Sequence, residues 1–334
     1  MKLLSEELKG KKKPLIIICA VAGLLLALMI IGTFLDYQIA HAVTAPYRGF
    51  LYYAFGMTFE FLGFLPAILV NVSLFAVLSV YSKKKCWKIA FHIFTAASLA
   101  GAVFCAVFWT LDNHGYGVSG VIAGPIVAVA GAALSFPVIL FFKRFDEIKL
   151  KKLIYILAIA AVLGSLTNLV VGVMQVFWGR YRFYQVTQNG FPYGPWYRPI
   201  GRGGDAESRH GSNSFPSLHA ASVCSTIALV LAAWVLKTKK STFITFGVIT
   251  GAMLILVPLS RMVLGWHYLT DVIFALIVGL IALVAAVIII DKGFGKKFKR
   301  FLNGDDESNN YNNSDTSGQV SNKEDENQTE AAAI

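Results

Sequence analysis

Long apolar runs separated by short polar segments make up most of the sequence. A helix needs about 20 apolar residues to cross the roughly 30 Å hydrocarbon core of a bilayer, and it satisfies its own backbone amides there. Eight runs meet this requirement, and they cover residues 14–35, 61–81, 89–111, 118–142, 153–177, 218–236, 243–259 and 272–290. The pattern therefore predicts an all-α, polytopic membrane bundle of about eight transmembrane helices.

The first apolar run has an alternative interpretation as a cleaved signal peptide, because Ala40-His41-Ala42 resembles a cleavage site. Signal peptides have an apolar core of roughly 7–15 residues, and this run is longer. A retained span is therefore expected. The order of the later spans is the same under both interpretations.

The composition agrees with membrane insertion. Hydrophobic residues make up 56% of the chain and charged residues only 15%, whereas about a quarter of a soluble domain is charged. Intrinsic disorder, a disulfide-stapled secreted fold and a nucleic-acid-binding module are disfavoured, so no nucleic-acid partner is expected. The four cysteines are expected to be small core residues rather than disulfide or metal partners: Cys19, Cys86, Cys105 and Cys224. No metal ion or other cofactor is predicted.

The basic residues divide between the two sides of the predicted membrane. Basic residues of short loops are retained on the cytoplasmic side. With a cytoplasmic N-terminus, every lysine falls in an inner segment, namely 1–13, 82–88, 143–152, 237–241 or 291–334. The arginines that fall outside are Arg48, Arg180, Arg182, Arg198, Arg202, Arg209 and Arg261. Because the guanidinium fork suits phosphate or carboxylate, these arginines predict an anion site on the outer face.

Three outer segments carry the candidate functional residues. The first, 175–183, places Arg180 and Arg182 just beyond the fifth span, where an aromatic interfacial belt is the simpler interpretation. The second, 214–219, opens the sixth span, and Ser217 is a candidate cap of a helix whose free amides favour an anion. A capped helix without a ligand is the alternative there.

The third segment, 260–271, places His267 and Asp271 four residues apart, so in a helix they share a face. The carboxylate could accept the proton on one imidazole nitrogen and leave the other nitrogen free to attack. An interfacial polar pair that holds the loop is the alternative. Together the three segments supply arginines, a helix N-terminus, two histidines and an aspartate, which is the set that phosphoryl transfer needs.

These residues resemble the three-part signature of the type 2 phosphatidic acid phosphatase superfamily, to which the vanadium haloperoxidases are related. Its patterns are K-x6-R-P, P-S-G-H and S-R-x5-H-x3-D. The third pattern matches completely at 260–271, and the second matches at 216–219 except for its glycine. The resemblance covers roughly residues 153–290. It implies a six-helix-type phosphatase core, here with extra N-terminal spans.

The resemblance also implies roles for individual residues in a metal-independent phosphatase that acts on lipid phosphates at the outer membrane face. His267 would be the nucleophile that forms a phospho-histidine, and Asp271 would orient it. His219 would protonate the leaving group. The groups that would hold the phosphoryl oxygens are Arg182, Arg261, Ser217 and the main-chain amide near Leu218.

The chain departs from the family pattern at Gln175, Phe183 and Leu218, where the patterns have lysine, proline and glycine. Leu218 still offers its amide. Gln175 can donate a hydrogen bond to the substrate but brings no charge, and a charge-assisted hydrogen bond is about twice as strong as a neutral one. Arg180 is expected to compensate, because it lies beside Arg182.

The segment 184–213 is rich in Gly, Tyr and Pro and is expected to cap the site. Arg198-Pro199 is an alternative first motif, but it fits worse because Phe191 occupies the lysine position. The arginines of this segment that are expected near the phosphate or head group are Arg198, Arg202 and Arg209.

The expected organisation has an N-terminal scaffold of four spans at 1–152, a catalytic core at 153–292 and a disordered, acidic cytoplasmic tail at 303–334. The leading hypothesis is a lipid-phosphate phosphatase of the cell membrane with both termini in the cytoplasm. Candidate substrates are phosphatidic acid, phosphatidylglycerol phosphate and a polyprenyl diphosphate. The alternatives are a phosphotransferase with the same intermediate and a non-catalytic lipid-phosphate binder or transporter.

Overall fold

The computed structural model describes residues 12–46, 49–104, 120–199 and 212–293. The predicted tail and four residues discussed above, Arg48, Cys105, Arg202 and Arg209, lie outside the described residues. Among the described residues, 12–290 fall into one compact unit and 291–293 into another.

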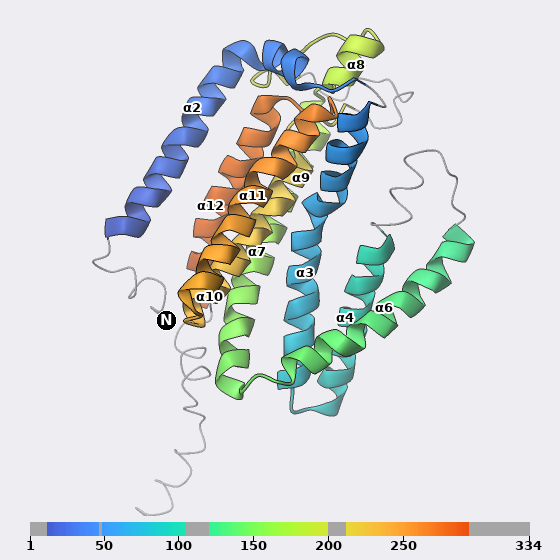
Figure 1. The fold of residues 1–334 in the computed structure, drawn as a ribbon, viewed down its shortest axis with the longest axis vertical. Coiled ribbons are helices and arrows are strands. Elements are labelled where there is room, and N and C mark those ends of the chain that lie inside the picture. The colour runs from blue at the N-terminus through green and yellow to red at the C-terminus, as the bar shows by residue number, and fades with distance from the viewer. Residues whose placement is uncertain (1–11, 47–48, 105–119, 200–211, 294–334) are drawn as a thin grey trace, which may run out of the picture. The chain divides into compact units, whose positions relative to one another are not determined.

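All secondary structure in the described part of the chain is helical (Figure 1). The elements are α2 (Lys12–Val43), η1 (Tyr52–Met57), α3 (Thr58–Tyr81), α4 (Lys85–Val103), α6 (Gly120–Phe142), α7 (Glu147–Trp178), α8 (Phe183–Gln188), α9 (Leu218–Val223), η3 (Cys224–Thr226), α10 (Ile227–Val235), α11 (Lys240–Val263) and α12 (Leu269–Gly293). The described residues hold 8 segments long and apolar enough to cross a membrane, with α9, η3 and α10 counted as one. The all-α, polytopic prediction is confirmed, and the protein is a multi-pass membrane protein.

Several helix ends differ from those predicted. The α2 helix continues to Val43, past residue 35, because Asp36 is buried against protein groups instead of facing the membrane. The sixth span is interrupted by the 3-10 turn η3, where the Thr226 hydroxyl donates to the carbonyl of Val223. The α11 helix ends at Val263 and α12 begins at Leu269, so only five residues connect them.

The helices before residue 147 fall into two groups, α2 with α3 and α4 with α6, that have different neighbours. The α4 and α6 helices pack against each other and against α3. The α3 helix packs in turn against α7, α9 and α11, and α2 contacts α11. In Figure 1, α4 and α6 accordingly lie on the side of α3 that faces away from α7.

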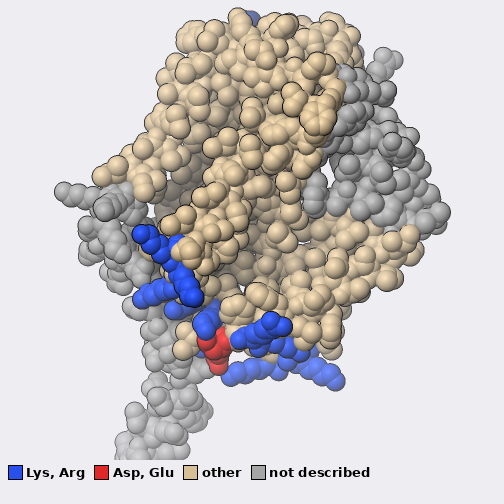
Figure 2. Space-filling view, in the orientation of Figure 1, with Lys and Arg blue, Asp and Glu red and all other residues tan. Residues whose placement is uncertain are grey.

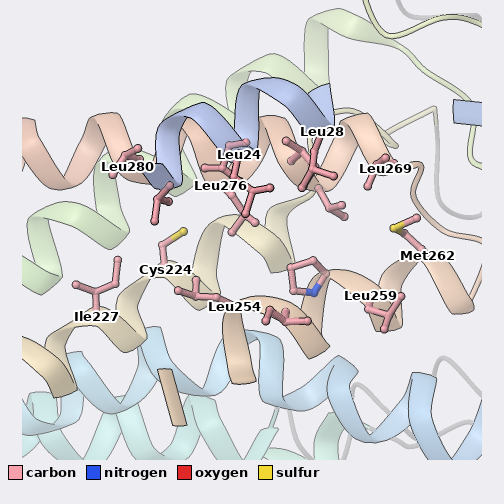
Figure 3. A pocket seen from close by; sticks show the side chains of 16 residues that line it. Leu24, Leu28, Cys224, Ile227, Leu254, Leu259, Met262, Leu269, Leu276 and Leu280 are labelled. Atoms are coloured by element: carbon pink, nitrogen blue, oxygen red, sulfur yellow. The ribbon is translucent and has the colours of Figure 1, made fainter. Parts of the chain in front are cut away.

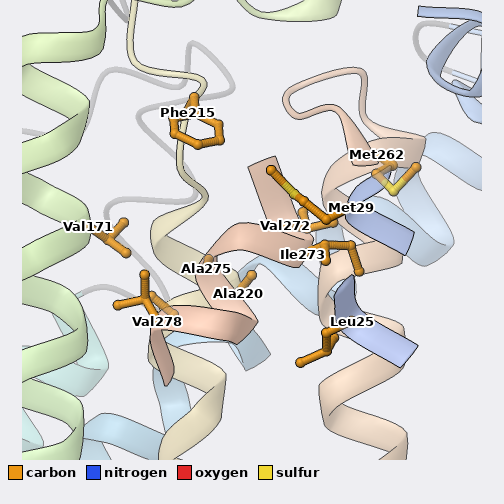
Figure 4. Packing of buried hydrophobic residues seen from close by; sticks show 11 residues of the cluster. Leu25, Met29, Val171, Phe215, Ala220, Met262, Val272, Ile273, Ala275 and Val278 are labelled. Atoms are coloured by element: carbon orange, nitrogen blue, oxygen red, sulfur yellow. The ribbon is translucent and has the colours of Figure 1, made fainter. Parts of the chain in front are cut away.

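A core of buried apolar side chains joins α2, α7, α9, α11 and α12 (Figure 4). Alanines on α9 and α12 let these helices approach closely, as small residues commonly do in membrane bundles. The core residues are Leu25, Met29, Val171, Phe215, Ala220, Ala221, Met262, Val272, Ile273, Ala275 and Val278. Of the described cysteines, only Cys224 has the predicted buried position, whereas Cys19 and Cys86 are exposed on their helices.

The two ends of the bundle differ in charge. The α3–α4, α6–α7 and α10–α11 connections lie at one end, and lysine and arginine side chains gather toward this end on the face shown in Figure 2. The α8 helix and the α11–α12 connection lie at the other end (Figure 1). The three candidate segments therefore meet at the end opposite to the lysine-rich connections.

Candidate active site

Local backbone features bring the three candidate segments to one end of the bundle. The α7 helix ends at Gly179, whose φ of 69° turns the chain away from the helix axis before Arg180. The α11–α12 connection turns at Gly265, whose φ is 67°. Glycine adopts these left-handed conformations without the steric cost that a Cβ atom imposes. Ser217 caps α9, where its side chain accepts from the amide of Ala220.

His267 is the candidate nucleophile, and only 3% of its surface is exposed. Its Nδ1 lies 2.7 Å from the carbonyl oxygen of Ser214. A carbonyl oxygen can only accept, so Nδ1 carries the hydrogen. The Nε2 atom is then left with its lone pair, which is the nucleophilic form of a neutral imidazole.

Asp271 lies beside this histidine but does not accept its main hydrogen bond. The distance from His267 Nδ1 to Asp271 Oδ2 is 3.6 Å. The same carboxylate oxygen accepts from the Ser214 hydroxyl at 2.5 Å and from the Tyr268 amide at 2.8 Å. Asp271 therefore acts on His267 through its charge and through Ser214, whereas the spacing alone predicted a direct hydrogen bond.

Two arginines flank the same tryptophan next to His267. The guanidinium carbons of Arg182 and Arg261 lie 4.9 Å and 4.5 Å from the centre of the Trp266 ring. Arg261 is fully buried, and Arg182 is partly exposed at the start of α8. The structure thus brings the two predicted phosphate-binding arginines to one place.

The surroundings of His267 favour the neutral form of its imidazole. Burial is the largest effect and lowers the pKa of His267 below its ordinary value. The hydrogen-bonding and charge effects of Asp271 act in the opposite direction. Arg182 and Arg261 lower this pKa further, because a positive charge disfavours a second one nearby.

His219, the candidate general acid, lies in the first turn of α9 under a ring from α3. The centre of its imidazole is 4.2 Å from the centre of the Phe64 ring. Within the described structure its Nε2 is buried and has no hydrogen-bond partner. The charges of Arg182, Arg261 and His267 act on His219, so these four side chains converge.

The remaining predicted binding residues hold the loop before α9. Gln175 donates from Nε2 to the carbonyl of Pro216 at 2.7 Å, so its amide is engaged with the protein. The amide of Ser217 donates to the carbonyl of Asp271 at 3.0 Å. Leu218, at the start of α9, is partly buried against the apolar core.

Arg180 has a different environment from the one expected. Its guanidinium is 1% exposed and forms salt bridges with Asp36 at 2.8 Å and with Asp271 at 2.6 Å. Its Nε donates to the carbonyl of Gly194 at 2.9 Å. A group held in this way cannot reach out to compensate for Gln175. Sequence reasoning missed Asp36, although an acidic residue at the end of a long apolar run is a signal for a buried partner.

The described part of the predicted cap is anchored through tryptophans. Trp178 donates to the carbonyl of Trp196 at 2.5 Å, and Trp196 donates to the Thr33 hydroxyl at 3.0 Å. Arg198 is exposed. Among the described histidines outside the motifs, His41 is exposed and His92 is partly exposed, and His92 bonds the Lys88 carbonyl of its own helix.

An apolar cavity of about 380 Å³ lies between α2, α11 and α12, with Cys224 of η3 and Ile227 of α10 at its wall (Figure 3). Met262 and Leu269, at one end of the cavity, belong to the motif segment 260–271. Its lining includes Leu24, Leu28, Leu254 and Leu276. In the described residues, no group of three or more His, Cys, Asp or Glu side chains is placed to hold a metal ion.

Residues 151–294 match the family model described as the PAP2 superfamily. Comparison with curated proteins and with solved structures gave no match. The matched residues include the three motif segments and the helices α7 to α12 that present them. Residues 151–294 therefore form a domain that matches the type 2 phosphatidic acid phosphatase (PAP2) superfamily, the family whose signature the three motif segments resemble.

Proposed function

We propose that this protein removes phosphate from a lipid phosphate through a phospho-histidine intermediate on His267. The observation that carries the proposal is the hydrogen bond from His267 Nδ1 to the Ser214 carbonyl, which leaves the Nε2 lone pair available. Burial lowers the pKa of His267 and so favours the neutral, nucleophilic form near neutral pH. A positioned nucleophile with an adjacent orienting group is the usual arrangement for covalent catalysis.

In the first step, the Nε2 lone pair of His267 forms a bond to phosphorus while the bond from phosphorus to the leaving oxygen breaks. His219 gives its proton to that oxygen. In the second step, His219 takes a proton from water, the water oxygen bonds to phosphorus, and the P–N bond breaks. Free phosphate leaves and His267 is restored with its lone pair on Nε2.

Positive charge is needed where the phosphoryl oxygens develop negative charge. We assign this role to Arg182 and Arg261, which flank Trp266 beside the nucleophile. Ser217 and the amide of Leu218 complete the proposed phosphate site at the start of α9. Gln175 is proposed to hold the Pro216 carbonyl, and thereby the loop, because its amide is already engaged there.

A lipid substrate and an outer active site fit the arrangement of the bundle. The cavity beside α11 and α12 is lined by apolar side chains, which suits a hydrocarbon tail. Lysine-rich connections mark the proposed cytoplasmic end, and the site lies at the opposite end. The catalytic core is proposed to span 153–292 in the cell membrane, with phosphatidic acid, phosphatidylglycerol phosphate or a polyprenyl diphosphate as substrate.

The test is phosphate release by the purified full-length protein in detergent, measured with each of the three candidate lipids. We expect release from at least one lipid. His267→Ala should lower kcat by roughly 10⁴-fold or more, as removal of a covalent nucleophile does. The matched control is His92→Ala, because His92 lies partly exposed on α4, outside the motif segments, and its substitution should leave activity unchanged.

Other outcomes contradict the proposal in distinct ways. Transfer of the phosphoryl group to a second lipid without free phosphate would identify a phosphotransferase. Binding of lipid phosphates without any turnover would identify a binder. Retention of turnover by His267→Ala would rule out this histidine as the nucleophile.

A further inference from the structure

A buried ionic cluster links the N-terminal helix α2 to the proposed catalytic aspartate. Asp36 lies inside α2 and is 2% exposed. Its Oδ2 accepts from Arg180 at 2.8 Å and from the Thr270 hydroxyl at 2.5 Å, and its Oδ1 accepts from the Thr270 amide at 3.0 Å. Each oxygen of this carboxylate is therefore bound to a group beside Asp271.

Arg180 lies between the two carboxylates. Its Nη1 donates to Asp271 Oδ1 at 2.6 Å, and its Nη2 donates to Asp36. The centre of the Tyr268 ring lies 3.9 Å from the guanidinium carbon of Arg180. The centre of the Tyr193 ring, from the segment after α8, lies 5.7 Å from the same carbon. Arg180 is thus fixed by α2, by α12 and by two aromatic rings.

The charges of this cluster do not cancel. One guanidinium faces two carboxylates, so the cluster carries an excess negative charge when both are ionised. A buried charge is costly unless it is paired and hydrogen-bonded, and each of these groups has such partners.

We propose that Asp36 and Arg180 are positioning residues, which act on the nucleophile His267 through Asp271. Arg180 holds Oδ1 of Asp271, so that Oδ2 faces Ser214 and His267. Asp36 offsets the charge of Arg180, which would otherwise neutralise Asp271. The negative charge then stabilises the positive charge that develops on His267 as Nε2 attacks phosphorus.

This inference rests on the proposed function and extends its site to a residue outside 151–294, the part of the chain that matches the family model. Neither Asp36 nor Arg180 is exposed to a substrate, so both should affect kcat and not KM. The charged and titratable groups that act on His267 are Asp271 from α12, Arg261 from α11, Arg182 after α7 and His219 from α9. Asp36 adds a group from α2.

The test compares Asp36→Asn, Asp271→Asn and the double variant in phosphate release. Asp36→Asn keeps the shape of the side chain but removes its charge. We expect kcat to fall on the order of tenfold and KM to stay unchanged. A loss of this size is typical when a residue is removed that does not touch the substrate but orients a side chain that does. The acid limb of the profile of kcat/KM against pH should move to lower pH, because less negative charge stabilises protonated His267.

The double variant separates positioning from loss of structure. In the Asp271→Asn background, Asp36→Asn should lower kcat by less than twofold, because its effect passes through Asp271. Gln38→Ala is the matched control, since Gln38 is exposed on the same helix two residues away. Full additivity of the two substitutions, or an unchanged kcat and pH profile in Asp36→Asn, would overturn the inference.

The outcome is distinguishable from a failure of the proposed function. If the wild-type protein releases phosphate and His267→Ala does not, the proposed function stands whatever Asp36→Asn does. If Asp36→Asn does not fold, Thr270→Val tests the same link, because it removes the hydroxyl that donates to Asp36. It should lower kcat in the same direction, and an unchanged kcat would again overturn the inference.

Discussion

Two pairs of helices precede the PAP2 domain, and they differ in what they contribute to the site. The α2–α3 pair reaches the proposed active site, where Asp36 binds Arg180 and the Phe64 ring covers His219. The α4–α6 pair packs mainly on itself and on α3. The sequences of all four helices have the pattern of apolar membrane spans, so this pattern does not indicate which of them reach the proposed active site.

Glycines on α3 and α6 both permit a neighbouring helix to approach closely, but the groups that approach them differ. A glycine at position 63 of α3 leaves room for the His219 ring, since a Cβ atom there would lie 2.7 Å from the imidazole Cδ2. A glycine at position 131 of α6 also permits close approach, but its neighbours are Ala96 and Ala100 on α4. A glycine thus makes room for a side chain of the proposed site in α3, whereas in α6 it permits the close packing of α4 and α6.

The largest loss of activity among these helices is expected for Gly63→Ala on α3. The added methyl group should displace His219 and lower kcat by roughly 100-fold, which is within the usual contribution of general acid catalysis. Phosphate release measures the effect. Gly101→Ala on α4 is the matched control, because a Cβ atom there meets nothing within 4 Å. Equal activities of the two variants would contradict the role of α3.

A smaller effect, on stability and not on chemistry, is expected for Gly131→Ala. A Cβ atom there would lie 2.5 Å from the carbonyl oxygen of Ala96, so α4 and α6 must move apart. Overpacking of this kind costs roughly 1–3 kcal/mol. The thermal midpoint should fall while kcat of the folded protein stays the same. A large loss of kcat would show that α4 and α6 also support the site.

The smallest expected effect concerns pH. Because the folded protein lowers the pKa of His267 below 6.5, the acid limb of kcat/KM should lie below pH 6.5 in the wild type and in Gly131→Ala alike. Because the pKa of His267 is lower in the folded state than in the unfolded state, protonation of His267 favours unfolding. The contribution of neutral His267 to the free energy of unfolding is therefore complete above pH 6.5 and is lost as the pH falls. An acid limb at or above pH 6.5 would contradict burial of the nucleophile.

The all-α architecture follows from the sequence, because the length of an apolar run is a local property. The positions of the lysines and arginines relative to these runs are equally local and predict the orientation. It also identified His267 and Asp271 as neighbours, and the structure places them 3.6 Å apart, although His267 lies in the connection before α12 and not within a helix. The candidate arginines Arg182 and Arg261 followed from motif spacing, and the structure brings both to Trp266.

The hydrogen-bond and ion-pair partners of the buried polar side chains depend on how the helices pack. Asp36 and Arg180 are 144 positions apart, and no periodicity in the sequence relates them. The acceptor of the His267 hydrogen is a main-chain carbonyl at Ser214, which any residue could have supplied. Hydrogen bonds and ion pairs of this kind form because the packed helices exclude water and each buried polar group must find a partner, wherever in the chain that partner lies.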